Sequence, residues 1–159
     1  MVIVSDTSVI SNLFQLGELS LLEMLYEEVV IPEKVLDELA KVLGHAETVR
    51  DMPWLSVKSA SDKGLTSRLQ AQLDPGESEA IALSIELKAD LLLIVERRGR
   101  HIAKQHGILI TGLLGILIEA KSRGFTERVK PMLDRLIFDI GFWVSPKLHQ
   151  DVLREVNEQ

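Results

Sequence analysis

The stretch MVIVSDTSVISN, residues 1–12, is the most informative part of this chain. Its apolar run, Val2 to Val4, is typical of a fully buried strand, and the run ends abruptly on a serine followed by Asp6. In an open α/β sheet, ligands bind in the crevice outside the carboxyl ends of the strands. Asp6 is therefore placed to hold a hard cation or to polarise a water. The alternative is that Asp6, Thr7 or Ser8 only caps the helix that follows.

The length and composition are those of one globular domain. The chain has 159 residues, of which 46% are hydrophobic and 26% charged. We expect a single domain over 1–159, with about 126–159 as a C-terminal helical extension. The absence of cysteine excludes disulfides and thiolate zinc sites and fits a cytoplasmic protein. We find no secretory leader and no uncharged run long enough to span a bilayer, so no membrane partner is expected.

The net charge of -6 argues against a general nucleic-acid coat protein, whose affinity would come from neutralising phosphates. It does not argue against a nuclease, because clustered metal-binding acids are negative by necessity.

Short apolar runs alternate with helical patterns, which predicts an α/β protein built from βαβ units around a parallel sheet. We expect strands near 2–5, 28–31, 91–95 and 108–110, with weaker candidates at 55–58 and 142–144. We expect helices over about 8–15, 18–26, 33–43, 64–72, 76–88, 97–106, 112–123 and 126–137.

A second candidate acid lies on the helix predicted after Pro32. Its apolar stripe has the helical period and consists of Val35, Leu36, Leu39, Val42 and Leu43. Glu38 borders this stripe, whereas Asp37 points almost directly away from it. Glu38 is therefore the acid of this helix expected to face a cleft, the alternative being an ordinary solvated acid.

A third candidate, Glu77, lies on the inward face of the helix predicted over 76–88. That face is formed by Ala80, Ile81, Ser84, Ile85 and Leu87, while Glu79 lies close to the opposite side. Burying an unpaired carboxylate is expensive, so Glu77 needs an explanation. Either Asp74 and Glu77 form a capping-box-like pair, or the first turn opens into a polar site occupied by a cation. The two explanations are compatible.

The fourth candidate, Glu96, directly follows the apolar strand predicted at 91–95. If this strand is a parallel neighbour of the first, Glu96 and Asp6 share one edge of the sheet. A basic helix start follows, made of Arg97, Arg98, Arg100, His101 and Lys104. These cations either contact phosphates or pair with nearby acids on a solvated face. Thr111, after the next strand, adds a hydroxyl to the same edge.

Together, Asp6, Glu38, Glu77 and Glu96 form an oxygen-rich set without thiols, and the four histidines show no ligand spacing. Hard oxygen ligands favour Mg²⁺ or Mn²⁺ over zinc or copper. With one or two such cations, a cluster of acids becomes a site that cleaves phosphodiesters.

Four segments that contain these acids resemble the PIN-domain family, metal-dependent ribonucleases that include VapC-type toxins. They are VSDTSVI around Asp6, IPEKVLDEL around Glu38, GESEAIAL around Glu77 and LLLIVERR around Glu96, and they span about residues 1–125. Within the family, the chain most resembles a branch of small prokaryotic proteins. The resemblance implies a three-layer α/β/α fold with a mainly parallel sheet and a carboxylate cluster at its C-terminal edge.

The resemblance also implies an RNA substrate and a small antitoxin protein as inhibitor, with one departure from the family pattern. Related sequences carry an aspartate in the stretch that here reads Ile94-Val95-Glu96. If the functional acid belongs at position 95, valine has replaced it; if it belongs at 96, glutamate substitutes for it. Two hypotheses follow. The protein is a toxin-like metal-dependent endoribonuclease, or it is a catalytically degenerate PIN domain that binds RNA or protein.

The largely helical C-terminal third, with Trp143 beside Phe142, suggests a homodimer or an antitoxin-binding groove, because exposed apolar patches usually mark such surfaces.

Overall fold

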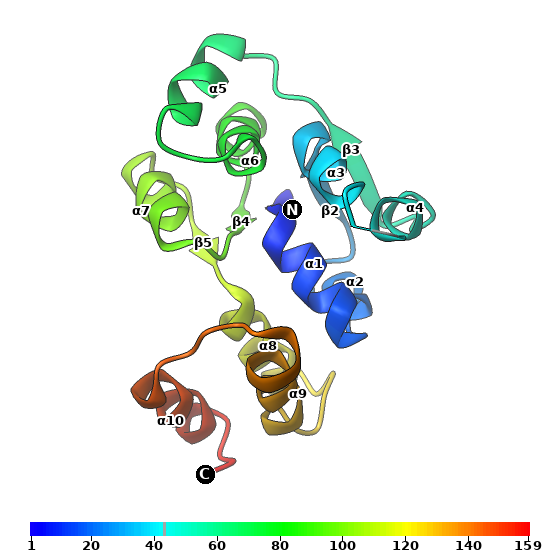
Figure 1. Ribbon diagram of the computed structural model, residues 1–159, viewed down its shortest axis with the longest axis vertical. Coiled ribbons are helices and arrows are strands. Elements are labelled where there is room, and N and C mark those ends of the chain that lie inside the picture. The colour runs from blue at the N-terminus through cyan, green and yellow to red at the C-terminus, as the bar shows by residue number, and fades with distance from the viewer. Residues whose placement is uncertain (43) are drawn as a thin grey trace.

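A five-stranded parallel sheet forms the centre of the protein in the computed structural model, which describes residues 1–42 and 44–159 (Figure 1). The strand order is β3-β2-β1-β4-β5, and every neighbouring pair is parallel. The strands are β1 (Ile3–Ser5), β2 (Val29–Pro32), β3 (Leu55–Lys58), β4 (Leu91–Leu93) and β5 (Ile110–Thr111). The predicted α/β class and the three-layer arrangement are confirmed.

Helices connect the strands and cover both faces of the sheet. In the first half of the chain they are α1 (Thr7–Leu16), α2 (Ser20–Tyr26), α3 (Glu33–Leu39), α4 (His45–Arg50) and α5 (Lys63–Gln70). In the second half they are α6 (Pro75–Leu87), α7 (Arg97–Gln105), α8 (Leu113–Ser122), α9 (Lys130–Arg135), the π-helix η1 (Leu136–Ile140) and α10 (Pro146–Glu155). None of the described helices has an apolar run long enough to cross a membrane.

The core has two parts because successive strand residues point to opposite faces of a sheet. Ile3 and Leu93 join the cluster formed with α1, α2, α8 and α9. Val4 and Leu92 join the cluster formed with α5, α6 and α7. Helix α6 is buried from Gly76 to Ser84, on all its sides, as expected of a helix packed between other elements.

Strand register brings the ends of β1, β4 and β5 to one edge. Ser5 lies opposite Leu93, which lies opposite Thr111. The backbone N–H of Asp6 donates to the carbonyl of Leu93 over 2.9 Å, and that of Ile94 donates to the carbonyl of Thr111 over 3.0 Å. The segments that begin at Asp6, Ile94 and Gly112 therefore leave the sheet side by side.

Several predicted boundaries were wrong. Residues 142–144 form no strand; instead the side chains of Phe142 and Val144 pack on the core from an irregular segment. Helix α3 ends at Leu39, so Val42 is 46% exposed instead of lying in the apolar stripe, and Leu43 lies outside the described residues. The helix predicted over 126–137 begins at Lys130.

Helix α4 was not predicted, and α10 was predicted only as part of a helical extension over 126–159, without bounds of its own. Helix α10 carries recognisable start signals, since Ser145 caps it by accepting a hydrogen bond from the backbone N–H of Leu148, and Pro146 occupies its first turn. The division of the chain into a single domain with a helical extension over 126–159 stays a prediction.

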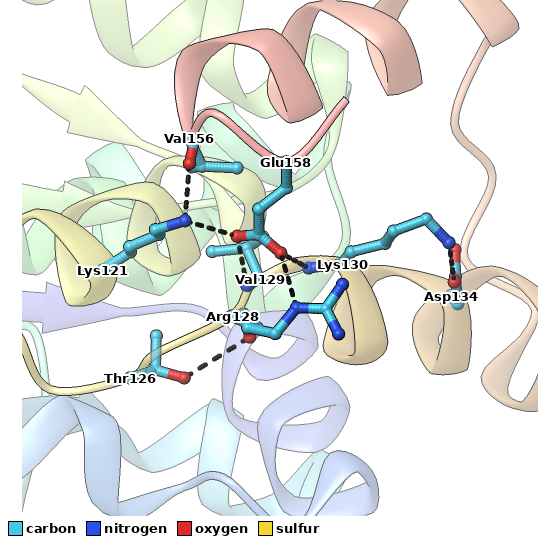
Figure 2. A network of polar contacts seen from close by, with 8 residues as sticks. All are labelled: Lys121, Thr126, Arg128, Val129, Lys130, Asp134, Val156 and Glu158. Carbon is cyan, nitrogen blue, oxygen red and sulfur yellow. Dashed lines mark hydrogen bonds and ion pairs between the residues drawn. The ribbon is translucent and has the colours of Figure 1, made fainter.

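Glu158 fixes the end of the chain against α8 and α9 (Figure 2). Its carboxylate accepts hydrogen bonds from the backbone N–H groups of Val129, over 2.7 Å, and Lys130, over 2.9 Å, and from the Lys121 ammonium, over 2.9 Å. Burial opposes ionisation, but these hydrogen bonds outweigh it and lower the pKa of Glu158 to about 2. The C-terminal residues are thus held by a charged group.

Candidate active site

Asp6 caps α1 and lies at the end of β1, as predicted, while its role in holding a cation stays a prediction. Its side chain is buried, with 1% of the residue exposed. One carboxylate oxygen, Oδ1, accepts from the backbone N–H of Val9 over 2.9 Å, and Oδ2 accepts from that of Val95 over 3.0 Å. Burial is the main cause that raises the pKa of Asp6 to about 7, and it outweighs these two hydrogen bonds. Repulsion from Asp74 and Glu96 acts in the same direction as burial.

Glu77 is the most unusual acid of the described chain. Asp74 caps α6 as predicted, since its Oδ1 accepts from the backbone N–H of Glu77 over 2.8 Å. The side chain of Glu77, however, is buried, and its Oε2 has no hydrogen-bond partner among the described residues. Burial, followed by the proximity of the Asp74 carboxylate, raises the pKa of Glu77 to about 8. Capping therefore explains Asp74 but leaves the carboxylate of Glu77 unexplained.

Glu38 is half-buried while Asp37 is exposed, as the helical pattern predicted. The Thr7 hydroxyl donates to Oε1 of Glu38 over 2.9 Å, which links α3 to the first turn of α1. Burial raises the pKa of Glu38, with a further contribution from Asp74, and the hydrogen bond from Thr7 partly offsets the rise.

Two glycines make room for these carboxylates. A Cβ atom added at Gly76 would overlap the carboxylate of Glu38, and one added at Gly99 would lie 2.6 Å from Oε2 of Glu77. Neither glycine has a positive φ, so space and not backbone conformation is what excludes a larger residue. These two positions were missed in the sequence, where a glycine inside a helical pattern has no distinctive local signal.

Glu96 is exposed, directly before α7, and its side chain makes no capping hydrogen bond. Its charge raises the pKa values of both Asp6 and Glu77. Val95 contributes only its backbone N–H to Asp6, while its side chain is half-buried and packs on the core. Of the two positions left open by the sequence, position 96 is the one that brings an acid near the others.

The structure thus brings Asp6, Glu77 and Glu96 close enough together that their charges affect one another, so they form one group of acids. Glu38 belongs to the same group because Asp74 repels its carboxylate, which lies against Gly76. Asp74 is a fifth acid of this group, predicted only as a cap. Glu79 was wrongly predicted to point outward: it is buried and accepts from the backbone N–H groups of Lys34, over 2.8 Å, and Ala60, over 3.1 Å. These two contacts give Glu79 a structural role outside the group.

The chemistry of this group of five acids fits a hard cation. Within residues 1–42 and 44–159, no lysine, arginine or histidine forms an ion pair with any of its members. Its donors are all oxygens, and one of them, Oε2 of Glu77, is buried without a partner. Over the part of the chain that the structure describes, no three acids or histidines lie close enough together to chelate an ion as they stand. Binding of an ion would therefore require these side chains to move closer together.

The structure is a three-layer α/β/α domain with acids gathered at the C-terminal edge of a parallel sheet, where proteins of this class bind their ligands. A comparison with known families narrows the class: a family model described as a PIN domain matches residues 2–158. The chain belongs to the PIN-domain family. PIN domains are generally nucleases and typically use divalent metal ions, which makes this a nuclease-type protein. No curated protein and no solved structure matches the chain.

Proposed function

We propose that this protein is an endoribonuclease that depends on Mg²⁺ or Mn²⁺, with Asp6, Glu38, Glu77 and Glu96 as its catalytic and metal-binding carboxylates. The observation that carries the proposal is that two buried carboxyl groups, those of Asp6 and Glu77, lie at one site and form no ion pair with a cationic side chain of the described chain. Buried unpaired charges are costly, and strongly shifted pKa values gather at functional sites.

The residues around the site support a division of roles. Asp6 is fixed by the two backbone N–H groups of Val9 and Val95. The Thr7 hydroxyl orients Glu38 by donating a hydrogen bond to its Oε1. Glu96 is exposed and is therefore the acid of this set that solvent and an approaching phosphodiester reach most directly. A bound divalent cation supplies activation of a water and stabilisation of the leaving oxygen.

A cleavage assay on structured RNA tests the proposal. With Mn²⁺ we expect cleavage by the parent, none after addition of EDTA, and none by Asp6→Asn. Asp37→Asn is the matched control, because Asp37 is an exposed acid on α3 beside Glu38 and is expected to leave cleavage unchanged. If metal has no effect, or if Asp6→Asn cleaves as well as Asp37→Asn, the catalytic assignment is wrong.

The second candidate function is a degenerate PIN domain that binds RNA or protein without cleaving RNA. Two observations favour it: valine stands at position 95, and the acids of the described chain are too far apart to chelate an ion as they stand. Calorimetric titration separates the two candidates. An active site binds Mg²⁺ or Mn²⁺ at millimolar concentration and loses this binding in Asp6→Asn, whereas a degenerate site binds neither ion.

The most specific part of the proposal is a toxin-like role for the protein, with a small antitoxin protein as its inhibitor. Its support is the resemblance of the four acidic segments to the PIN-domain family, which includes VapC-type toxins. Induced expression of the parent should arrest bacterial growth, and Asp6→Asn should not. A parent that leaves growth unchanged while it cleaves RNA in the test tube would remove the toxin role and leave the nuclease in place. The homodimer that the apolar C-terminal third of the sequence suggests is checked by sedimentation of the purified protein.

A further inference from the structure

A second surface feature lies next to the acids, on the side of β5. It is an open cavity of about 710 Å³ lined by α7, the turn from β5 into α8, the irregular segment between η1 and α10, and apolar side chains of α8 and α10. Figure 1 shows this segment in orange, passing α8 on its way to α10. The volume is in the range of natural ligand sites.

One wall of the cavity is basic. Arg97, Arg100, His101 and Lys104 line it from one face of α7, at the spacing of successive helical turns. None of the four forms an ion pair in the described chain, so the alternative that they pair with nearby acids is wrong. No aspartate or glutamate among the described residues lines this cavity. In a chain of net charge -6, this is a local reversal of sign.

Arg100 is the most firmly placed of these cations. It is half-buried, and its guanidinium lies against the backbone of Gly112, where a Cβ atom would overlap it. Gly112 immediately follows β5 and precedes α8. The absence of a side chain at Gly112 therefore lets Arg100 reach across from α7 to the turn at the sheet edge.

The lining of the cavity also includes an aromatic side chain that the fold leaves uncovered. Trp143 is 78% exposed and lines the cavity together with the half-buried Phe142. A large exposed indole costs free energy in water unless a ligand covers it. Its ring offers a flat apolar face beside a row of cations.

The cavity continues toward the acids. A smaller cavity of about 400 Å³ shares Val95, Phe142 and Trp143 with the first, and it is lined on its other side by Ser8 and Glu96. A chain-like ligand could therefore pass from the basic wall, across Trp143, to the edge where Asp6 and Glu96 lie.

We propose that this basic cavity binds a single-stranded stretch of RNA next to the bond to be cleaved, with Arg97, Arg100 and Lys104 at its phosphates and a base stacked on Trp143. Cationic grooves combined with aromatic platforms are the usual means of holding single strands. The charge favours this occupant over an acidic or apolar protein segment, because cations spaced along a helix match phosphates spaced along a strand. The inference rests on the proposed function, because the RNA in this cavity lies next to the bond to be cleaved only if that bond lies at the neighbouring acids.

Binding by the parent and by every variant is measured without cleavage, in EDTA, as the fluorescence anisotropy of a dye-labelled single-stranded RNA of about 12 nucleotides, a length within the range that single-strand sites cover. In proteins that keep Trp143, tryptophan emission gives a second readout. The chain has two tryptophans, of which Trp54 is 8% exposed and Trp143 is 78% exposed. Quenching of tryptophan emission by RNA therefore reports mainly on Trp143. We expect saturable quenching by the single strand and weaker binding of a duplex of the same sequence.

Two matched pairs of variants test the contacts. Trp143→Ala should weaken binding about 5- to 150-fold, the usual range for loss of one stacked base, and Trp143→Phe should restore much of it. Phe138→Ala is the control, because Phe138 is 79% exposed and lies outside both cavities. Arg97→Gln should reduce the slope of log affinity against log salt by about 0.7. Arg98→Gln, an exposed cation of α7 that does not line the cavity, should leave the slope unchanged.

Equal RNA binding by Trp143→Ala and Phe138→Ala would overturn the inference, as would RNA binding without quenching. A change in oligomeric state in Trp143→Ala, with RNA binding intact, would also overturn it and would identify the cavity as a protein interface. Metal-dependent cleavage of RNA, without quenching of Trp143 by RNA, would refute this inference and leave the proposed nuclease function in place. Saturable quenching without any metal-dependent cleavage would refute the proposed nuclease function and leave the RNA-binding cavity standing.

Discussion

Replacing Glu77 by glutamine should make the metal-free protein more stable, although it changes a buried carboxyl group of the site itself. Glutamine has the same shape and no charge. Oε2 of Glu77 has no hydrogen-bond partner to lose. The amide that replaces it can donate to the neighbouring Asp74 carboxylate, which now repels Glu77.

The magnitude follows from the pKa of Glu77, which rises from 4.5 to about 8 on folding. Each unit corresponds to about 1.4 kcal/mol, so ionisation opposes folding by up to about 5 kcal/mol above pH 8. Repulsion from Asp74 causes part of this rise in the pKa of Glu77, and the site can relax, so we expect about half the effect, a gain of about 2 kcal/mol at pH 8. Because the pKa is raised in the folded state, the cost is absent below pH 4.5 and grows as the pH rises to about 8.

Urea unfolding in EDTA at pH 8 and pH 5 measures this difference. For a chain of this length, 2 kcal/mol corresponds to a rise in Tm of about 6 °C. The gain should shrink below about 1 kcal/mol at pH 5, and Mn²⁺ should stabilise the parent more than Glu77→Gln. Glu23→Gln, at an exposed position of α2, is the control and should change nothing. A Glu77→Gln protein less stable than the parent at pH 8, or equally stabilised at both pH values, would refute the reasoning.

Three further predictions concern stability and metal binding. Glu158→Gln should lower the free energy of unfolding by about 2 kcal/mol at pH 7, since its hydrogen bonds are charge-assisted. Because the folded pKa of Glu158 is lowered to about 2, this difference should disappear as the pH falls from 4.5 toward 2; urea unfolding shows it, and a pH-independent difference would contradict it. Gly99→Ala should displace Glu77 and weaken Mn²⁺ binding in calorimetry, whereas Gly64→Ala, where a Cβ meets only ordinary contacts, should leave it unchanged. Removal of metal by EDTA should lower the Tm of the parent but not that of Asp6→Asn.

The sequence by itself was sufficient for the class of fold and for the acids that follow strands. An apolar run that ends on a charge marks the end of a buried strand, so Asp6 and Glu96 could be placed at one edge before any coordinates. Helix start signals were equally local, and Asp74 caps α6 as its sequence predicts. Strand ends and helix caps of this kind can be predicted because they depend only on residues a few positions away in the sequence.

Tertiary structure alone decided which side chains are covered, because burial depends on neighbours far along the chain. Helix α6 shows the reason: it packs on all sides, so its period could not reveal that Glu79 is buried or that Ile85 is 37% exposed. The same holds for Gly99, where the carboxylate of Glu77 fills the space of a side chain. Exposure of Trp143 beside a basic wall was likewise beyond the sequence, because an apolar triplet reads the same whether it pairs as a strand or crosses a surface cavity.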